Sequence, residues 1–221
     1  PALKDADSPE AYAALAKPEK VNLRLESMKG LFDGSKILFI SSLEPRGIIA
    51  AITFAKRHGV KKMVLTGADE SALAVKEFLK ENNIPVLVDN PQSLPKYEHS
   101  DIKMPFKLAA ELTKAGILVG LTYSNQAYAN LPFAAGQTVA YGLTKEEALK
   151  TVTINTARIL GIDDMTGSLE KGKDANIVVS EGDLLDMRSS IVDLAFISGR
   201  NINLDNKHKQ LFRRFSEKYE Q

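Results

Sequence analysis

The sequence predicts an α/β protein whose short parallel strands alternate with helices, followed by a small β layer and a terminal helix. Apolar stretches alternate with amphipathic ones, and strand starts recur roughly every 22 to 33 residues, the length of a strand plus a crossover helix. The strands are apolar on consecutive residues, as in Ile37–Ile40, which is typical of strands covered on both faces. Such repeats form either an open doubly wound sheet or a (β/α)8 barrel.

The elements before residue 122 follow one another in that alternating order. Residues 1–20 are rich in Ala, Pro and charge and predict a partly helical arm, and residues 21–32 predict a helix that Gly34 ends. A helix begins at Pro45, because proline is tolerated in a first helical turn; its buried stripe is expected at Ile48, Ile49, Ile52 and Ala55, and Gly59 ends it. The strands are expected at 36–40, 63–65, 84–88 and 117–121, and the intervening helices at 68–80 and 104–115.

The C-terminal third begins with a helix that has a clear start and a clear end. Thr144 and Glu147 have the spacing of a capping box, in which each side chain accepts from the other residue's backbone N–H. Apolar residues then continue at helical spacing to Leu160, and Gly161 supplies a left-handed stop. After two further glycines, residues 175–179 are rich in β-branched residues and predict a strand.

The composition excludes several classes of protein. With 221 residues, 44% hydrophobic and 26% charged, the chain can bury a core of one or two domains. A net charge of +1 gives no long-range attraction to nucleic acid or membranes. The absence of cysteine removes thiolate chemistry and disulfides but assigns no compartment. No apolar run approaches the ~20 residues of a membrane helix, no signal peptide is visible, and because the first residue is Pro1 we expect natural sequence before it.

A run of motifs in the C-terminal third resembles a known family. The motifs are Asn155-Thr156-Ala157 with Leu160-Gly161, and Gly167-Ser168-Leu169-Glu170 with Gly172-Lys173-Asp174-Ala175. They are similar to the end of metal-dependent amidohydrolases, above all imidazolonepropionase-like and dipeptidase-like members. The resemblance extends from about Lys36 to the C-terminus.

The resemblance implies a particular architecture. Residues 36–162 would form the second half of a TIM-like (β/α)8 barrel with about four βα units, and residues 163–203 the C-terminal part of a β-sandwich built from both chain ends. Residues 1–35 would be an N-terminal helical arm and 204–221 a C-terminal helix. A half-barrel leaves two sheet edges, so we expect a homo-oligomer or an active amidohydrolase partner to cover them. An open sheet that closes by itself is the alternative.

The resemblance also implies where the chemistry should be. Family members hold zinc with histidines and a carboxylate at the carboxyl ends of the barrel strands, and the metal makes hydroxide available near neutral pH. The positions that would carry two of those histidines and the last-strand aspartate match Ser41, Thr66 and Tyr123 here. We therefore predict no catalytic residue and no metal or cofactor held by this chain, although active relatives are expected to use zinc.

The histidines have no ligand spacing. His58 ends a helix, His99 lies in a polar loop and His208 in the C-terminal tail. We predict a structural or solvated role for each.

Polar residues at the strand exits are the candidate ligand-binding residues. Asp69 either caps the following helix or contacts a ligand, with capping favoured, and Asp89 either points into a barrel mouth or begins a turn. The full set of candidates is Ser41, Thr66, Asp69, Asp89, Gln92, Tyr123, Ser124 and Asn125.

Two other patterns predict ordinary structure. Gly167–Lys173 has the glycine and lysine spacing of a phosphate-binding loop, but Asp174 and a strand follow where a helix must begin. The basic, aromatic run 204–219 is able in principle to lie on a membrane or in a partner's groove; we expect it to dock on its own domain. No nucleic-acid signature is present.

Three functional hypotheses follow. The first is an amidohydrolase-like chain without its metal site, acting as a degenerate domain or partner subunit that binds a ligand or pairs with an active relative. The second is part of a working amide or dipeptide hydrolase whose metal ligands lie mostly in a missing N-terminal half. The third is a structural or oligomerisation module.

Overall fold

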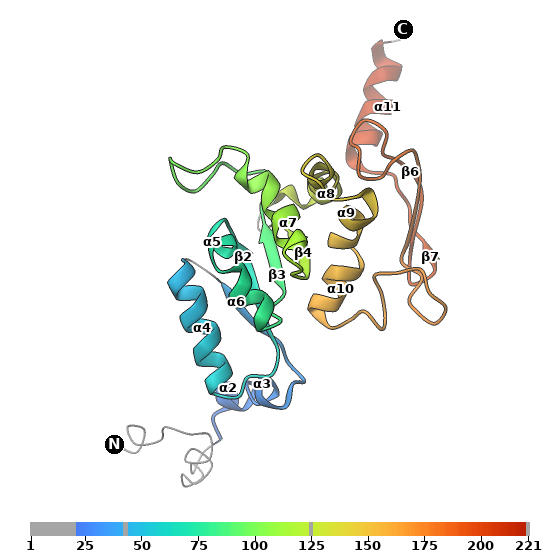
Figure 1. Cartoon of the computed structure of the whole chain (residues 1–221). Coiled ribbons are helices and arrows are strands. Elements are labelled where there is room, and N and C mark those ends of the chain that lie inside the picture. The colour runs from blue at the N-terminus through green and yellow to red at the C-terminus, as the bar shows by residue number, and fades with distance from the viewer. Residues whose placement is uncertain (1–20, 42–43, 124–125, 220–221) are drawn as a thin grey trace.

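The computed structural model describes residues 21–41, 44–123 and 126–219, and contains two sheets (Figure 1). The first sheet is parallel in the order β1-β2-β3-β4, and the second is antiparallel in the order β5-β6-β7. The predicted α/β class with a parallel sheet and a later β layer is therefore confirmed. The strands are β1 (Leu38–Ser41), β2 (Met63–Ala68), β3 (Val86–Asp89), β4 (Val119–Thr122), β5 (Ile177–Glu181), β6 (Ile191–Ile197) and β7 (Arg200–Asn201).

Helices fill the connections between the parallel strands and link the two sheets. The segment between β4 and α9 also contains two helices that the sequence analysis did not predict, η1 and α8. The helices in the described residues are α2 (Leu23–Glu26), α3 (Gly30–Asp33), α4 (Pro45–Arg57), α5 (Ser71–Ala74), α6 (Lys76–Glu81), α7 (Met104–Lys114), the 3₁₀ helix η1 (Gln126–Asn130), α8 (Leu131–Val139), α9 (Lys145–Thr151), α10 (Ile154–Leu160) and α11 (Lys207–Tyr219).

Three helices that were predicted as continuous are each broken in two. Residues 21–32 form α2 and α3, with the Ser27 hydroxyl donating to the Arg24 carbonyl at the break. The range 68–80, predicted as one helix, begins with the last residue of β2 and then contains α5 and most of α6, which meet at Val75. The helix from Thr144 breaks at Thr153, whose φ of −126° and ψ of −104° are not helical. Threonine hydroxyls compete for helical carbonyls, and here the Thr153 hydroxyl donates to Leu149 O.

The start and the end of the C-terminal helix pair are as predicted. Thr144 and Glu147 form the complete capping box, and Gly161 ends α10 with a φ of +69°. Between them, the break directs α10 onto the parallel sheet. The predicted phosphate-like loop 167–173 is a turn before β5, as expected.

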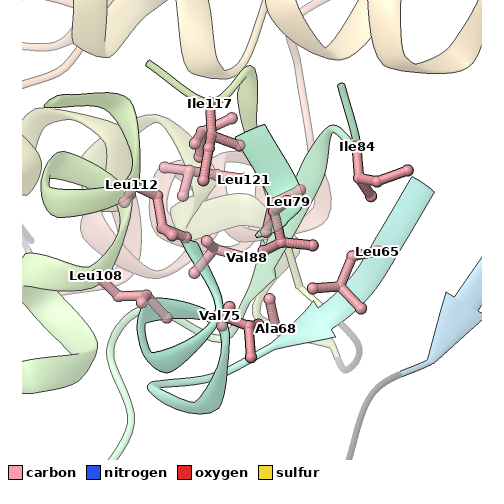
Figure 2. Packing of buried hydrophobic residues seen from close by; sticks show 14 of the residues in the cluster. Leu65, Ala68, Val75, Leu79, Ile84, Val88, Leu108, Leu112, Ile117 and Leu121 are labelled. Carbon is pink, nitrogen blue, oxygen red and sulfur yellow. The ribbon is translucent and has the colours of Figure 1, made fainter. Parts of the chain in front are cut away.

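The main core lies between one face of the parallel sheet and the helices that cover it. Figure 2 shows Leu65 of β2, Val88 of β3 and Leu121 of β4 meeting Leu79 of α6 and Leu112 of α7. These side chains are almost fully buried. The predicted stripe of α4 is buried except at Ile49, which is 39% exposed.

The opposite face of the parallel sheet is covered by α10 only near the amino ends of the strands. Val64 of β2, Leu87 of β3 and Ile159 of α10 form a second, smaller buried cluster. Close packing requires glycine at one point, because a Cβ on Gly120 would lie 2.7 Å from the Thr156 hydroxyl oxygen. At the carboxyl ends of the strands, this face carries the residues of the candidate site and is not covered by α10.

The C-terminal helix does not dock as predicted. In α11, Phe212 is 73% and Tyr219 79% exposed, and the helix extends away from both sheets (Figure 1). A local ion pair, between Arg213 Nη2 and Asp205 Oδ2 at 2.7 Å, joins α11 to the segment before it. The expectation of an aromatic face packed on its own domain is therefore wrong for the described residues.

No helix in the described part of the chain is a candidate for crossing a membrane. None of its helices combines the length and apolar character that a bilayer crossing requires.

Two helical glycines predict opposite effects for the same substitution. A Cβ on Gly47 of α4 meets nothing within 4 Å, whereas a Cβ on Gly136 of α8 would lie 2.2 Å from the Leu185 carbonyl oxygen. We expect Gly47→Ala to raise the free energy of unfolding by about 0.5 kcal/mol through helix propensity. We expect Gly136→Ala to lower it by about 1–3 kcal/mol through overpacking.

Urea unfolding with a common slope would measure both changes. Equal effects of the two substitutions would show that α8 does not pack against Leu185 as described.

Candidate functional site

Polar side chains lie at the carboxyl ends of the parallel strands, on the face that α10 leaves open. Ser41 pairs in register with Thr66, and Asp89 with Thr122. Side chains alternate between the faces of a strand, so these four residues share the face of the smaller buried cluster. The strands thus bring together three of the predicted residues, Ser41, Thr66 and Asp89, as members of one row.

An irregularity in β2 places a second carboxylate beside the row. The register between β2 and β3 shifts between Leu65 and Ala68, and Gly67 there has a φ of +64°. One extra residue on a bulged strand re-aims the side chains that follow it. As a result Asp69 and Asp89 line the same pocket.

Asp69 is held in place by its neighbours. Its Oδ1 accepts the Ser71 N–H at 2.8 Å, and its Oδ2 accepts from Lys96 Nζ at 2.8 Å. Burial acts to raise the pKa of Asp69, but the hydrogen bonds from Lys96 and Ser71 outweigh it, so the pKa lies below its ordinary value of 3.8. Asp69 does not cap α5 as expected, because the N-cap residue is Glu70, which makes no side-chain cap hydrogen bond. Asp69 instead accepts the Ser71 N–H in the turn that leads into α5, and its carboxylate is ionised at neutral pH.

Asp89 is only partly satisfied. Its Oδ2 accepts from Asn90 Nδ2 at 3.0 Å, while its Oδ1 is buried and has no hydrogen-bond partner among the described residues. A buried acceptor without a donor costs free energy, so this carboxylate has capacity for one more hydrogen bond.

Tyr123 and Gln92 belong to a hydrogen-bonded chain that leads away from the pocket. The Tyr123 hydroxyl donates to Gln92 Oε1, and Gln92 Nε2 donates to Gln137 Oε1 on α8, both at 3.0 Å. Partial burial, together with the negative charge of Asp89, raises the pKa of the Tyr123 hydroxyl. Tyr123 is therefore a neutral hydrogen-bonding group just after the carboxyl end of β4.

Part of the predicted set cannot be placed, and part of the site was not predicted. Ser124 and Asn125 lie outside the described residues. Sequence reasoning missed Lys96 and Gln137, which are 27 and 45 residues from their partners Asp69 and Gln92. The one available signal was the location of Lys96 in the long polar connection after β3.

The described residues contain no cluster of metal-ligating side chains. Within residues 21–41, 44–123 and 126–219, no group of three or more His, Cys, Asp or Glu side chains could hold a metal. His58 packs on Phe54 with ring centroids 4.3 Å apart, His99 stacks on Tyr97 at 5.4 Å, and His208 lies on α11.

The motifs of the C-terminal third join α10 to the strand that ends at the site. Asn155 Nδ2 donates to the Val119 carbonyl of β4 at 3.1 Å, and Thr156 lies against Gly120. A Cβ on Gly167, which has a φ of +95°, would lie 2.7 Å from the Cβ of Ala157. A family model described as the amidohydrolase family matches residues 20–202, a range that includes these motifs. The chain belongs to the amidohydrolase family.

Curated and solved family members agree with this assignment. An imidazolonepropionase from Thermoplasma volcanium is 48% identical over 56 residues, which cover 25% of this chain and 14% of that protein. One from Flavobacterium johnsoniae is 30% identical over 96 residues, covering 41% of this chain and 23% of the relative. These matches support the predicted imidazolonepropionase-like branch.

The solved structures extend the likeness over most of the fold. An amidohydrolase from Thermotoga maritima has a TM-score of 0.74 and 26% identity over 87% of this chain. An adenosine deaminase from Xanthomonas campestris with bound zinc has a TM-score of 0.54 over 90% of this chain and, at 17% identity, shares the fold alone. The chain spans about half the length of both, namely 50% and 55%.

The pH dependence of stability should report on Asp69. Because its pKa is lowered by folding, the ionised carboxylate stabilises the fold above the pKa of the unfolded chain, and this stabilisation disappears as the pH falls through the folded-state pKa. Asp69→Asn should therefore lower the free energy of unfolding by about 1 kcal/mol at pH 7, and by progressively less below about pH 4.

Urea denaturation between pH 3 and 7 would measure the difference from the unchanged protein. Asp193→Asn, at an exposed position on β6, is the matched control and should change stability little at any pH. A deficit for Asp69→Asn that stays constant down to pH 3 would contradict the described hydrogen bonds.

Proposed function

We propose that this chain is the C-terminal half of an amidohydrolase barrel, that it supplies no metal ligand, and that it acts as the non-catalytic part of a hydrolase. One observation carries the proposal. Ser41, Thr66 and Tyr123 lie at the carboxyl ends of β1, β2 and β4, and from the resemblance we match them to the histidines and the aspartate of active family members. Hydroxyl groups replace imidazole and carboxylate there, and neutral hydroxyls do not provide the ligands that zinc prefers.

Exposed apolar surface supports the half-barrel reading. Phe39 on β1 is 42% exposed on the same face as the polar row, although strands of closed barrels normally bury that face. In the second sheet, Val178 is 52% and Ile197 57% exposed, as expected for one layer of a sandwich that lacks its opposite layer. A complementary half, from another copy or from an active amidohydrolase partner, would cover these surfaces.

The polar side chains at the carboxyl ends of the parallel strands are able to bind a molecule through hydrogen bonds. Ser41, Thr66 and Tyr123 offer hydroxyl groups that either donate or accept. These groups orient an amide or a carboxylate of a bound molecule. Among the described residues, none of these hydroxyls hydrogen-bonds to a base that would activate water, so we assign the hydrolytic step to an active amidohydrolase partner.

A second candidate is that this chain is part of an active hydrolase; the curated relatives, which are imidazolonepropionases, support hydrolase activity in general. In that case the assembled protein hydrolyses a cyclic or linear amide, and its metal is held mainly by the other half. The two candidates differ in the source of the metal-binding half: in the first a separate active partner supplies it, and in the second the full-length protein contains it.

Metal analysis of the full-length protein separates the candidates. We expect the purified protein to contain no stoichiometric zinc and to show no amide hydrolysis. About one equivalent of Zn²⁺ or more, with activity that a chelator removes, would establish the second candidate instead.

Substitution at Asp89 tests whether this half touches the metal in either case. If the full-length protein holds zinc, Asp89→Asn should leave its zinc content unchanged, as should the control Asp193→Asn. Loss of zinc from Asp89→Asn alone would show that this half supplies a ligand.

A further inference from the structure

The C-terminal helix α11 presents an apolar stripe to solvent. Leu211, Phe212, Phe215 and Tyr219 are three or four residues apart or adjacent, so at about 100° per residue they share one side of the helix. All four are exposed, with Phe212 at 73% and Tyr219 at 79%. Because α11 extends away from both sheets (Figure 1), the described part of the chain leaves this apolar stripe uncovered.

Local hydrogen bonds start the helix. Asn206 Oδ1 accepts the Lys209 N–H at 3.0 Å, which is the hydrogen bond of an N-cap. Asp205 Oδ2 accepts from Arg213 Nη2 at 2.7 Å and from Gln210 Nε2 at 3.1 Å. The apolar stripe is therefore formed before any partner binds, and docking costs less ordering entropy than it would for an unstructured segment.

Positive charge is concentrated on α11. Its sequence contains five Lys and Arg residues and a single acidic residue, Glu217, which gives the helix a net charge of +4. The whole chain has a net charge of only +1, so the residues outside α11 carry −3. A negatively charged surface would therefore attract this helix and repel the rest of the chain.

The cationic residues flank the apolar stripe on both sides. At helical spacing, one side carries Lys207, Arg214 and Lys218, and the other carries Lys209 and Arg213. Long Lys and Arg side chains extend their charged ends toward water or phosphate while their stems lie along apolar surface. This is the arrangement of helices that lie in the plane of a membrane surface, with aromatic residues on one face and cations on the other.

Two further observations favour a lipid surface over a protein groove or a bilayer crossing. Three of the five cations are lysines, and lysine is depleted at protein–protein interfaces. The helix has 13 residues, whereas crossing a bilayer takes about 20. The helix is therefore suited to lie on a membrane.

We propose that α11 binds the surface of a membrane that contains anionic phospholipid. The helix lies parallel to the bilayer, with Phe212, Phe215 and Tyr219 at the boundary between headgroups and acyl chains and the flanking cations at the lipid phosphates. Each Lys or Arg near such a surface strengthens binding roughly fivefold. The binding is independent of whether the assembled protein hydrolyses amides.

Vesicle co-sedimentation with the full chain tests the charge requirement. The chain should bind vesicles of two parts phosphatidylcholine to one part phosphatidylserine at least about tenfold more tightly than vesicles of phosphatidylcholine alone. Lys207→Gln combined with Arg214→Gln should weaken binding to the anionic vesicles at least about tenfold. The control, Lys61→Gln combined with Lys62→Gln, removes the same charge from exposed positions before β2 and should leave binding unchanged.

Insertion of the apolar stripe has a separate readout, because the chain contains no tryptophan. Phe212→Trp introduces a single fluorophore, whose emission should shift to shorter wavelength when the anionic vesicles are added. The control Phe54→Trp places the fluorophore on α4, at a side chain that is 65% exposed, and its emission should not shift.

Four results would each overturn the proposal. They are no binding to the anionic vesicles, equal binding to phosphatidylcholine alone, equal weakening by the two charge variants, and an emission shift that is absent at position 212 or equal at position 54. A helix that instead occupies the groove of a protein would give the first result. If a variant does not fold, as judged by circular dichroism, the comparison of the two kinds of vesicle on the unchanged chain still decides the question.

Discussion

The close approach of α10 to β4 is the contact on which the arrangement of the molecule depends. Gly120 lets Thr156 come within reach, and the Asn155 side chain closes the approach with a hydrogen bond to the Val119 carbonyl. This contact covers the amino half of one face of the parallel sheet and leaves the carboxyl half open. Gly167 packs against the same helix, so the turn that leads to the second sheet starts from a defined position. The most recognisable motifs in the sequence are therefore structural ones.

Much of the fold was predictable because its signals are local. Consecutive apolar residues identified each parallel strand to within two residues at its start, and the capping box and Gly161 identified the ends of the C-terminal helix pair. The helix breaks were not predictable, because both halves of each helix keep helical spacing. Thr153 leaves the helix only when tertiary contacts with β4 favour a new direction for α10. Tertiary contacts of this kind override local propensity.

The location of the candidate site in the fold was predictable, but the directions of its side chains were not. Exits of parallel strands meet at one edge of a sheet, and Ser41, Thr66 and Asp89 do lie there. The bulge at Gly67 decides that Asp69 joins Asp89 at one pocket, while the amide of Gln92 leads the hydrogen bonds of Tyr123 toward α8. Pattern reasoning assigns no direction to a side chain beyond a bulge. Partners that are distant in sequence, such as Lys96, are likewise invisible to it.

The isolation of α11 has a consequence for how the protein unfolds. Its aromatic residues bury little surface, as Phe212 and Tyr219 show, so melting this helix exposes little additional apolar area. Regions with few buried apolar contacts open at a small fraction of the global free energy. Amide protons in α11 will therefore exchange with solvent long before those of β2 and β3, and a protease will trim the C-terminus while the parallel sheet stays intact.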